Sequence, residues 1–231
     1  MPFLRSAVLL LAAATSIGAG KPAARLGPVA PANWTATVAL TPGGAHLLGN
    51  PAARVKLVEY VSYTCSHCAD FEIQAGSELA LGFIKPGTGS MEFRPYFRNT
   101  VDIAATLMAY CGPPSRFMGN HAALLRGQKG WLTNVTPEQQ KRWRSGTFAS
   151  QMQAVASDLK LYDLFIKRGY NRIELERCLA NEPLARRISA ENQTAESVLG
   201  IAGTPSFVLN DRLVDAADWR SLRPYLAAAT R

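Results

Sequence analysis

The stretch that decides the fold of this chain is VEYVSYTCSHCADF, residues 58–71. Its first part, up to Val61, is rich in β-branched and aromatic residues and predicts a buried strand. From Cys65 onward the apolar residues fall three and four positions apart, which is the spacing of one helix face. The sequence therefore predicts a strand that runs through a loop at residues 62–64 directly into a helix.

Two cysteines stand at the start of this predicted helix. Cys65 would lie in the first turn, where free backbone N–H groups and the helix dipole favour an anion such as a thiolate. Cys68 follows one turn later, within disulfide reach. Because the thiolate reacts in thiol–disulfide exchange, we expect Cys65 to be the exposed nucleophile and Cys68 the more buried resolving thiol. His67, between them, can supply a donor or a positive charge that lowers the pKa of Cys65.

Two other uses of a CxxC pair stay open at this point. The pair could be half of a zinc site, but a closed zinc site needs four ligands. The remaining candidates are single and distant from one another: Cys111, Cys178, His46 and His121. The pair could also be a purely structural disulfide, although the strand-to-helix context favours a redox motif. We therefore expect no bound metal.

A further motif lies near the C-terminus, GIAGTPSFVL at residues 200–209. Pro205 opens an apolar run of β-type residues, a place where a strand tolerates proline. Together the two motifs resemble the thioredoxin superfamily, and specifically its DsbA-like branch, over residues 56–226. The CSHC motif resembles the DsbA active-site strand and helix, and the GTPSF motif resembles the cis-proline loop. The sequence departs from the DsbA pattern between the two cysteines, where it has Ser66-His67 and the commonest DsbA dipeptide is Pro-His. This departure leaves the redox potential open.

The resemblance implies an α/β protein with a thioredoxin-like fold and a helical insertion. It implies a cis bond between Thr204 and Pro205 that faces Cys65, and a substrate peptide held there by backbone contacts. Glu59 occupies the position of an acid in the DsbA-like pattern, and could relay the proton of Cys68. The alternative is an edge-strand carboxylate that points to solvent.

The resemblance also implies a function, a thiol:disulfide oxidoreductase that needs no bound cofactor. Its substrates would be unfolded or reduced exported proteins, and a quinone-linked membrane oxidase of the DsbB type would reoxidise it. Two rival hypotheses remain, a disulfide reductase or isomerase with the same fold and a peptide-binding holdase whose disulfide is only structural. The formal charge of +8 is spread over scattered basic residues, without a basic stripe interleaved with aromatics. Nucleic acid is therefore not an expected partner.

The N-terminal residues 1–20 are typical of a secretory signal peptide, with Arg5, an apolar run at residues 7–14 and small residues at 18–20. The alternative is an uncleaved membrane anchor, for which the apolar run is short. Residues 21–33, rich in Pro, Ala and Gly, predict a flexible leader. This leader is too short for a dimerisation domain such as the disulfide isomerases carry, so we expect a periplasmic monomer.

The remaining chain divides into a thioredoxin-like domain, residues 34–100 and 181–231, and a helical insertion, residues 101–180. Within the domain we expect a first strand in residues 34–40, and a strand at 91–97 with Pro95 at an edge or bulge. Within the insertion we expect a helix over residues 150–164.

Cys111 and Cys178 both fall on predicted helices of the insertion. An oxidising compartment and an even number of cysteines predict a structural disulfide between them. The alternative is a pair of buried free thiols.

Overall fold

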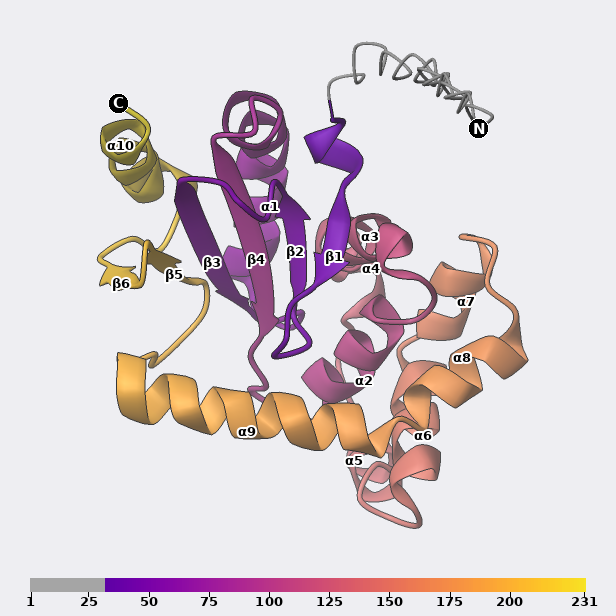
Figure 1. The fold of residues 1–231 in the computed structure, drawn as a ribbon. Coiled ribbons are helices and arrows are strands. Elements are labelled where there is room, and N and C mark those ends of the chain that lie inside the picture. Colours follow the sequence, from indigo (N-terminus) through magenta and orange to yellow (C-terminus); the bar gives the residue numbers. More distant parts are fainter. Residues whose placement is uncertain (1–31) are drawn as a thin grey trace, which may run out of the picture. The chain divides into compact units, whose positions relative to one another are not determined.

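The computed structural model describes residues 32–231, and their centre is a mixed sheet flanked by helices (Figure 1). The strand order is β1-β2-β4-β3-β5-β6. The neighbours β3 and β4 run parallel, and the other adjacent pairs run antiparallel. The strands are β1 Val38–Leu40, β2 His46–Gly49, β3 Val55–Val61, β4 Gly89–Pro95, β5 Ser206–Leu209 and β6 Arg212–Val214. The expected signal peptide and all but the last two residues of the expected leader lie outside the described residues.

The helices that surround the sheet differ widely in length. They are α1 Ser66–Glu78, α2 Thr100–Ala109, α3 Phe117–Arg126, α4 Gln128–Trp131, α5 Pro137–Arg142, α6 Phe148–Asp158, α7 Leu161–Ile166, α8 Arg172–Leu179, α9 Glu182–Leu199 and α10 Trp219–Ala229. Short 3-10 turns span Trp34–Ala36 and Pro114–Arg116, and a π-helical turn spans Leu79–Ile84. None of the helices within residues 32–231 is long and apolar enough to cross a bilayer.

The two faces of the sheet pack against different helices. Phe71 of α1 lies 4.7 Å from Phe207 of β5 and 6.5 Å from Trp219 of α10, measured between ring centroids, so α1 and α10 share one face. On the other face, Tyr60 and Val208 pack with residues at the C-terminal end of α9. Because successive strand residues point to opposite faces, the neighbours of Tyr60 in β3 point toward α1.

The strand–helix–strand unit β3–α1–β4 has the parallel strands that the order of elements predicts, with Leu57 opposite Met91. The expected edge or bulge at Pro95 is wrong, because β4 is an internal strand. Pro95 is its last residue, and β2 pairs with β4 only as far as Phe93. The next residue, Tyr96, donates its N–H to β3, so the nitrogen of Pro95 points to the side where β2 has already ended. The missing N–H therefore costs no ladder hydrogen bond.

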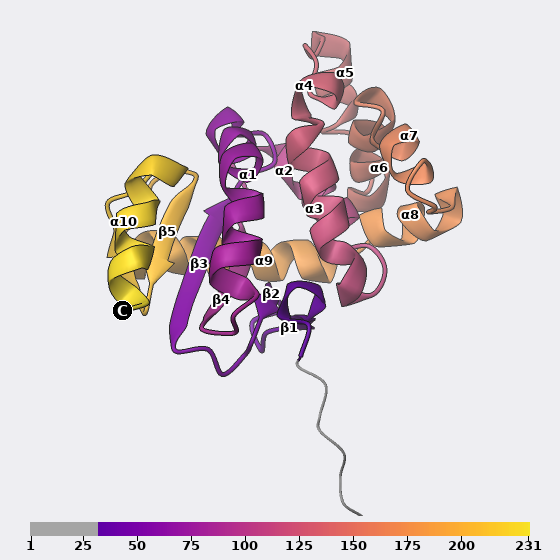
Figure 2. The ribbon, with the colours of Figure 1, turned by 90° about the horizontal axis from the view of Figure 1, so that it is seen from above.

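The helices between β4 and α9, here called the helical group, lie towards the right in Figure 2, and β5 and α10 lie at the left. The expected helix over residues 150–164 is divided into α6 and α7, because Lys160 adopts a left-handed conformation with φ of 55°. The expected first strand is shorter, since residues 34–36 form a 3-10 turn. One apolar core runs through both parts, so the boundaries of the insertion at residues 101–180 stay a prediction.

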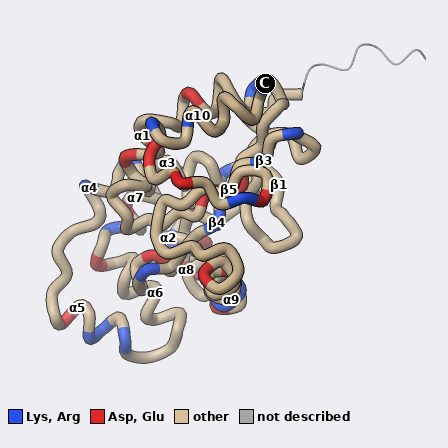
Figure 3. Tube along the Cα trace, turned by 90° about the vertical axis from the view of Figure 1, so that its left-hand side faces the viewer, with Lys and Arg blue, Asp and Glu red and all other residues tan. Residues whose placement is uncertain are grey.

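The helix α9 leads the chain from the helical group back to the sheet (Figure 1). It is followed by the hairpin of β5 and β6, whose turn residues Asn210 and Asp211 both have positive φ, as a type I′ turn requires. In Figure 3 the acidic and basic residues are interspersed along the trace and do not form a stripe of one sign.

Candidate active site

The two motifs found in the sequence meet in space. Cys65 forms the N-cap of α1, and its Sγ lies 3.1 Å from the carbonyl oxygen of Thr204. The Thr204–Pro205 peptide bond is cis. Both Cys65 and Cys68 are free thiols, so the structure corresponds to the reduced protein at this site. Cys65 is only 5% exposed and therefore less open than expected, but Cys68 is fully buried, so the order of exposure is the expected one.

The surroundings of Cys65 favour its thiolate. The pKa of Cys65 is lowered from 9.0 to about 4, and the largest cause is a hydrogen bond from the Cys68 thiol. Burial acts in the opposite direction. The Thr204 side chain and the backbone N–H groups of Cys68 and His67, at the start of α1, add to the lowering. Cys65 is thus ionised at neutral pH, and this is the state that attacks a disulfide.

The partner thiol has the opposite character. Burial raises the pKa of Cys68 above its usual range, and the hydrogen bond to Cys65 and the charge on Glu59 raise it further. Cys65 and Cys68 are one helical turn apart, and they differ in ionisation: the environment stabilises the thiolate of Cys65 and the protonated thiol of Cys68. This asymmetry favours Cys65 as the attacking thiol, and Cys68 must lose its proton before it can act as a nucleophile.

Glu59 lies in the interior of the sheet and is 1% exposed, so the alternative of a solvent-facing edge carboxylate is wrong. It is paired in register with Phe207 and faces α1. Its Oε1 has no hydrogen-bond partner in the structure. Burial raises the pKa of Glu59 well above its usual range, and the charges on Glu72 and Cys65 add to this. A buried carboxyl group with a raised pKa can donate a proton, and the carboxylate that remains can take one up.

Another acid, Glu72 of α1, connects this region to the surface. Its carboxylate is 2.9 Å from the guanidinium of Arg126 in α3, and the Arg126 side chain is half exposed. Burial raises the pKa of Glu72, and the charge of Arg126 counteracts this rise.

The His67 side chain is exposed. Its backbone N–H is among the groups that lower the pKa of Cys65, whereas no hydrogen bond of its imidazole is present. The expected role of the imidazole stays a prediction.

A comparison with known protein families shows to which family this chain belongs. The family model described as thioredoxin matches residues 41–228. The chain belongs to the thioredoxin family. The resemblance given by the CSHC and cis-proline motifs is thereby confirmed, and the α/β fold with added helices is that of its DsbA-like branch.

Known proteins of this family show different degrees of similarity. A solved structure described as a protein-disulfide isomerase from Novosphingobium aromaticivorans has 45% sequence identity, covers 81% of this chain and 98% of its own, and gives a TM-score of 0.78. α-DsbA1 from Wolbachia pipientis has 18% identity, covers 82% of this chain and 91% of its own, and gives a TM-score of 0.65, which shows a shared fold. A Rickettsia bellii protein named as a protein-disulfide oxidoreductase is 25% identical over 165 residues, or 71% of this chain. The matched region is 56% of that relative, so the chain spans about half the length of the curated relatives it matches.

Within this thioredoxin-family site, two buried side chains that the sequence did not single out hold the active-site loop. Gln128 of α4 donates hydrogen bonds to the carbonyl oxygens of Tyr63 and Cys65, at 2.8 and 3.0 Å. Asp102 of α2 accepts hydrogen bonds from Ser62 and from Thr64. Nothing in the sequence indicated that the helix carrying Asp102 lies against the loop.

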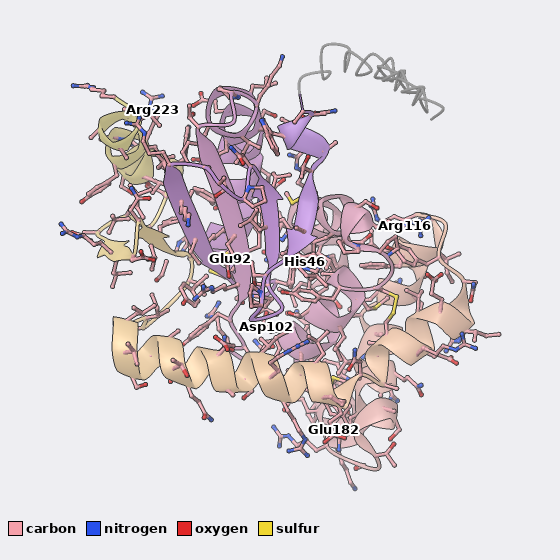
Figure 4. All side chains as sticks on the ribbon, viewed as in Figure 1. His46, Glu92, Asp102, Arg116, Glu182 and Arg223 are labelled. Atoms are coloured by element: carbon pink, nitrogen blue, oxygen red, sulfur yellow. A yellow bond between two sulfur atoms is a disulfide. The ribbon has the colours of Figure 1, made fainter. Side chains whose placement is uncertain are left out.

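Away from the site, Cys111 and Cys178 are joined by a disulfide with a Cα–Cα distance of 5.5 Å (Figure 4). Cys111 follows the end of α2 and Cys178 lies in α8. The bond links two helices of the helical group whose cysteines are 67 positions apart in the sequence.

Proposed function

We propose that this chain is a protein thiol:disulfide oxidoreductase that introduces disulfides into exported proteins through Cys65 and Cys68. The observation that carries the proposal is the Cys65 sulfur, held between the first turn of α1 and the cis-proline loop with its pKa lowered to about 4. A stabilised thiolate favours the reduced dithiol over the disulfide. The disulfide form is then a strong oxidant and transfers readily to a substrate.

The reaction starts from the oxidised Cys65–Cys68 pair. A substrate thiolate attacks Sγ of Cys65, the Cys65–Cys68 bond breaks, and Cys68 leaves and takes up a proton. Another substrate thiolate then attacks the substrate sulfur of the mixed disulfide, and Cys65 leaves as a stable thiolate. The substrate loses two electrons and two protons, and the enzyme gains the electrons. In this proposal Glu59, which is buried and whose charge influences Cys68, gives a proton to Cys68 and removes it during reoxidation.

Thr204 and Pro205 form the proposed substrate-binding edge. The carbonyl of Thr204 lies against the nucleophile, and Pro205 lacks an N–H. An extended peptide could add to this edge by main-chain hydrogen bonds, which would make binding tolerant of sequence and suited to unfolded chains.

The setting that we propose is the periplasm, reached through the signal peptide at residues 1–20. The disulfide between Cys111 and Cys178 supports an oxidising compartment, where such bonds persist. There the protein would act as a monomer and be reoxidised by a quinone-linked membrane oxidase of the DsbB type.

A rival candidate function is disulfide isomerisation or reduction. It is favoured by the similarity to the Novosphingobium aromaticivorans protein, which is described as an isomerase and is 45% identical. An isomerase needs its thiols kept reduced, whereas the low pKa of Cys65 favours a protein that passes its disulfide on.

The deciding experiment is the redox equilibrium of purified protein with glutathione, followed by oxidation of a reduced, unfolded substrate. The oxidase proposal expects a more oxidising equilibrium than that of an ordinary dithiol, and stoichiometric transfer of one disulfide to substrate. The variants Cys65→Ser and Cys68→Ser are the controls, and neither should transfer a disulfide. A reducing equilibrium together with efficient rearrangement of scrambled disulfides would support the isomerase. Substrate binding that survives both substitutions, without transfer by the parent protein, would support the holdase.

A further inference from the structure

Asp102 is a buried carboxylate whose hydrogen bonds go mainly to another part of the chain. It lies in the first turn of α2 and is 1% exposed. Its Oδ1 accepts from Ser62 Oγ and from the Thr64 N–H, both at 2.9 Å. Its Oδ2 accepts from Thr64 Oγ1 at 3.1 Å and from the Arg98 N–H at 3.0 Å. Three of the four donors belong to the loop that immediately precedes Cys65.

Thr64 is therefore held on several sides. Its N–H and its hydroxyl both donate to Asp102, and its hydroxyl also accepts from Asn99 Nδ2 at 2.9 Å. The next residue is Cys65, whose N–H donates to Ser62 to close a tight turn. The same loop ends at the N-cap of α1, so its geometry decides where the first N–H groups of α1 point.

Asp102 is not needed to cap its own helix. That role belongs to Asn99, whose Oδ1 accepts from the N–H groups of Val101 and Asp102. Only one of the four hydrogen bonds of Asp102, that from Arg98, stays within its own segment. Figure 4 shows Asp102 where the strands end and α2 begins. This is where the loops after the parallel strands β3 and β4 meet.

We propose that Asp102 is a positioning residue for the Cys65 nucleophile, which it serves by holding Thr64 so that the first turn of α1 presents its N–H groups to the thiolate. The proposal rests on the proposed function, because it concerns the same thiolate. According to this proposal, α2 of the helical group helps to set the reactivity of Cys65, which lies in the thioredoxin-like domain.

The sharpest test is Asp102→Asn, which keeps the shape of the side chain and removes half of its acceptors. Each carboxylate oxygen accepts from one backbone N–H, of Thr64 or of Arg98, and a backbone N–H cannot turn away. Whichever way the new amide faces, its NH₂ group meets one of these donors. The loop should relax, and we expect the pKa of Cys65 to rise by about one pH unit, a tenfold change in thiolate equilibrium.

The direction in which the pKa of Cys65 changes distinguishes a positioning role of Asp102 from a direct effect of its charge. Removing a nearby negative charge would lower the pKa of Cys65, because a thiolate is repelled by a carboxylate. Thr64→Val leaves the charge of Asp102 in place and removes the hydrogen bonds of the Thr64 hydroxyl with Asp102, Asn99 and Ser62. The hydrogen bond from the Thr64 N–H to Asp102 remains, so positioning predicts a smaller rise with this variant. In the double variant that combines Asp102→Asn with Thr64→Val, the pKa of Cys65 should rise by less than the sum of the two single rises, since both substitutions act through Thr64. Should Asp102→Asn fail to fold, Thr64→Val alone gives the answer.

The control variant is Thr106→Val, one turn further along α2. Its hydroxyl is buried without a partner, so the exchange tests the packing of α2 and should leave the pKa of Cys65 unchanged. Thiolate absorbance and the pH dependence of alkylation, with a melting curve for each variant, supply the measurements. A fall or no change in pKa for Asp102→Asn, with a low parent value, would overturn the proposal. An ordinary Cys65 pKa in the parent protein would instead overturn the proposed function.

Discussion

The Sγ of Cys65 lies 3.1 Å from the carbonyl oxygen of Thr204, although the two residues are 139 positions apart in the sequence. This contact joins the loop after β3 to the loop before β5, which are neighbouring strands of the sheet. The nucleophile therefore faces the main chain to which we propose that a substrate peptide binds. We therefore expect residues at this contact to affect both the pKa of Cys65 and the binding of substrate.

Thr204→Val should raise the pKa of Cys65 by less than about one unit. The Thr204 side chain lowers this pKa, and its hydroxyl is buried without a hydrogen-bond partner in the structure. Valine keeps the shape and removes the donor, while the groups at the start of α1 remain. Titration of thiolate absorbance gives the shift. Ser206→Ala, on the far side of Pro205, is the matched control, and an equal shift in that variant would contradict a specific role for Thr204.

Glu59→Leu should stabilise the protein and slow the step that involves Cys68. A buried carboxyl with an unpartnered oxygen costs free energy, so its replacement by leucine should raise the free energy of unfolding by about 1–2 kcal/mol. Without a proton relay, attack by Cys68 on a mixed disulfide should become slower near neutral pH. Chemical denaturation and rapid-mixing kinetics with a preformed mixed disulfide provide the two measurements. Unchanged Cys68 kinetics in this variant would remove Glu59 from the mechanism.

His67→Leu should have only a small effect on the Cys65 thiolate. The imidazole is exposed, where solvent and salt weaken its electrostatic influence, and the backbone N–H of His67 survives the substitution. We expect a rise of less than about one unit in the pKa of Cys65, diminished at high salt. Titrations at low and high ionic strength test this. A rise of several units would mean that the imidazole, rather than the helix start, holds the thiolate.

The residues that could be predicted from the sequence are those whose signal is local. Cys65 and Cys68 stand at a visible strand-to-helix transition, and Pro205 opens a visible strand. Glu59 was ambiguous because β3 is apolar on both faces, so alternation alone could not give its direction. Its burial follows from the position of β3 in the middle of the sheet, which depends on strands far away in the sequence.

The residues that were missed act through tertiary contacts. Gln128 and Asp102 reach the active-site loop because α4 and α2 pack beside it, and no spacing in the sequence shows that packing. The break between α6 and α7 was missed for a different reason. Lysine at position 160 gives no breaker signal such as glycine or proline, and its left-handed conformation is imposed by its surroundings.

Replacing both Cys111 and Cys178 by alanine should destabilise the fold and leave the active site unchanged. A bond that closes 67 positions of chain contributes up to about 4 kcal/mol in the chain-entropy model. The pKa of Cys65 should not move, because neither cysteine is among the groups that influence it. In the parent protein with an oxidised active site, thiol counting after denaturation without reduction should find no free thiol. Two thiols that map to Cys111 and Cys178 would show that the bond does not form in solution.

The reduced and oxidised forms should exchange their order of stability as the pH changes. Folding lowers the pKa of Cys65 from 9.0 to about 4, and a group with a depressed pKa stabilises the fold above its unfolded pKa. This contribution is full above pH 9, declines below it and is lost as the pH falls through about 4. At pH 7 it amounts to about 4 kcal/mol for the reduced form, at about 1.4 kcal/mol per unit. The short loop closed by the Cys65–Cys68 disulfide contributes about 2 kcal/mol to the oxidised form in the chain-entropy model.

The reduced form should therefore melt higher than the oxidised form at pH 7, and the two melting curves should coincide at about pH 5.5, where the two contributions are equal. Below that pH the disulfide should be the stronger stabiliser. Calorimetry of both forms between pH 4 and 9 measures the difference. The control is Cys65→Ser, which has no thiolate at this position and should lack the pH-dependent gain of the reduced form. An oxidised form that melts higher at every pH would contradict the stabilised thiolate and favour the reductase over the oxidase.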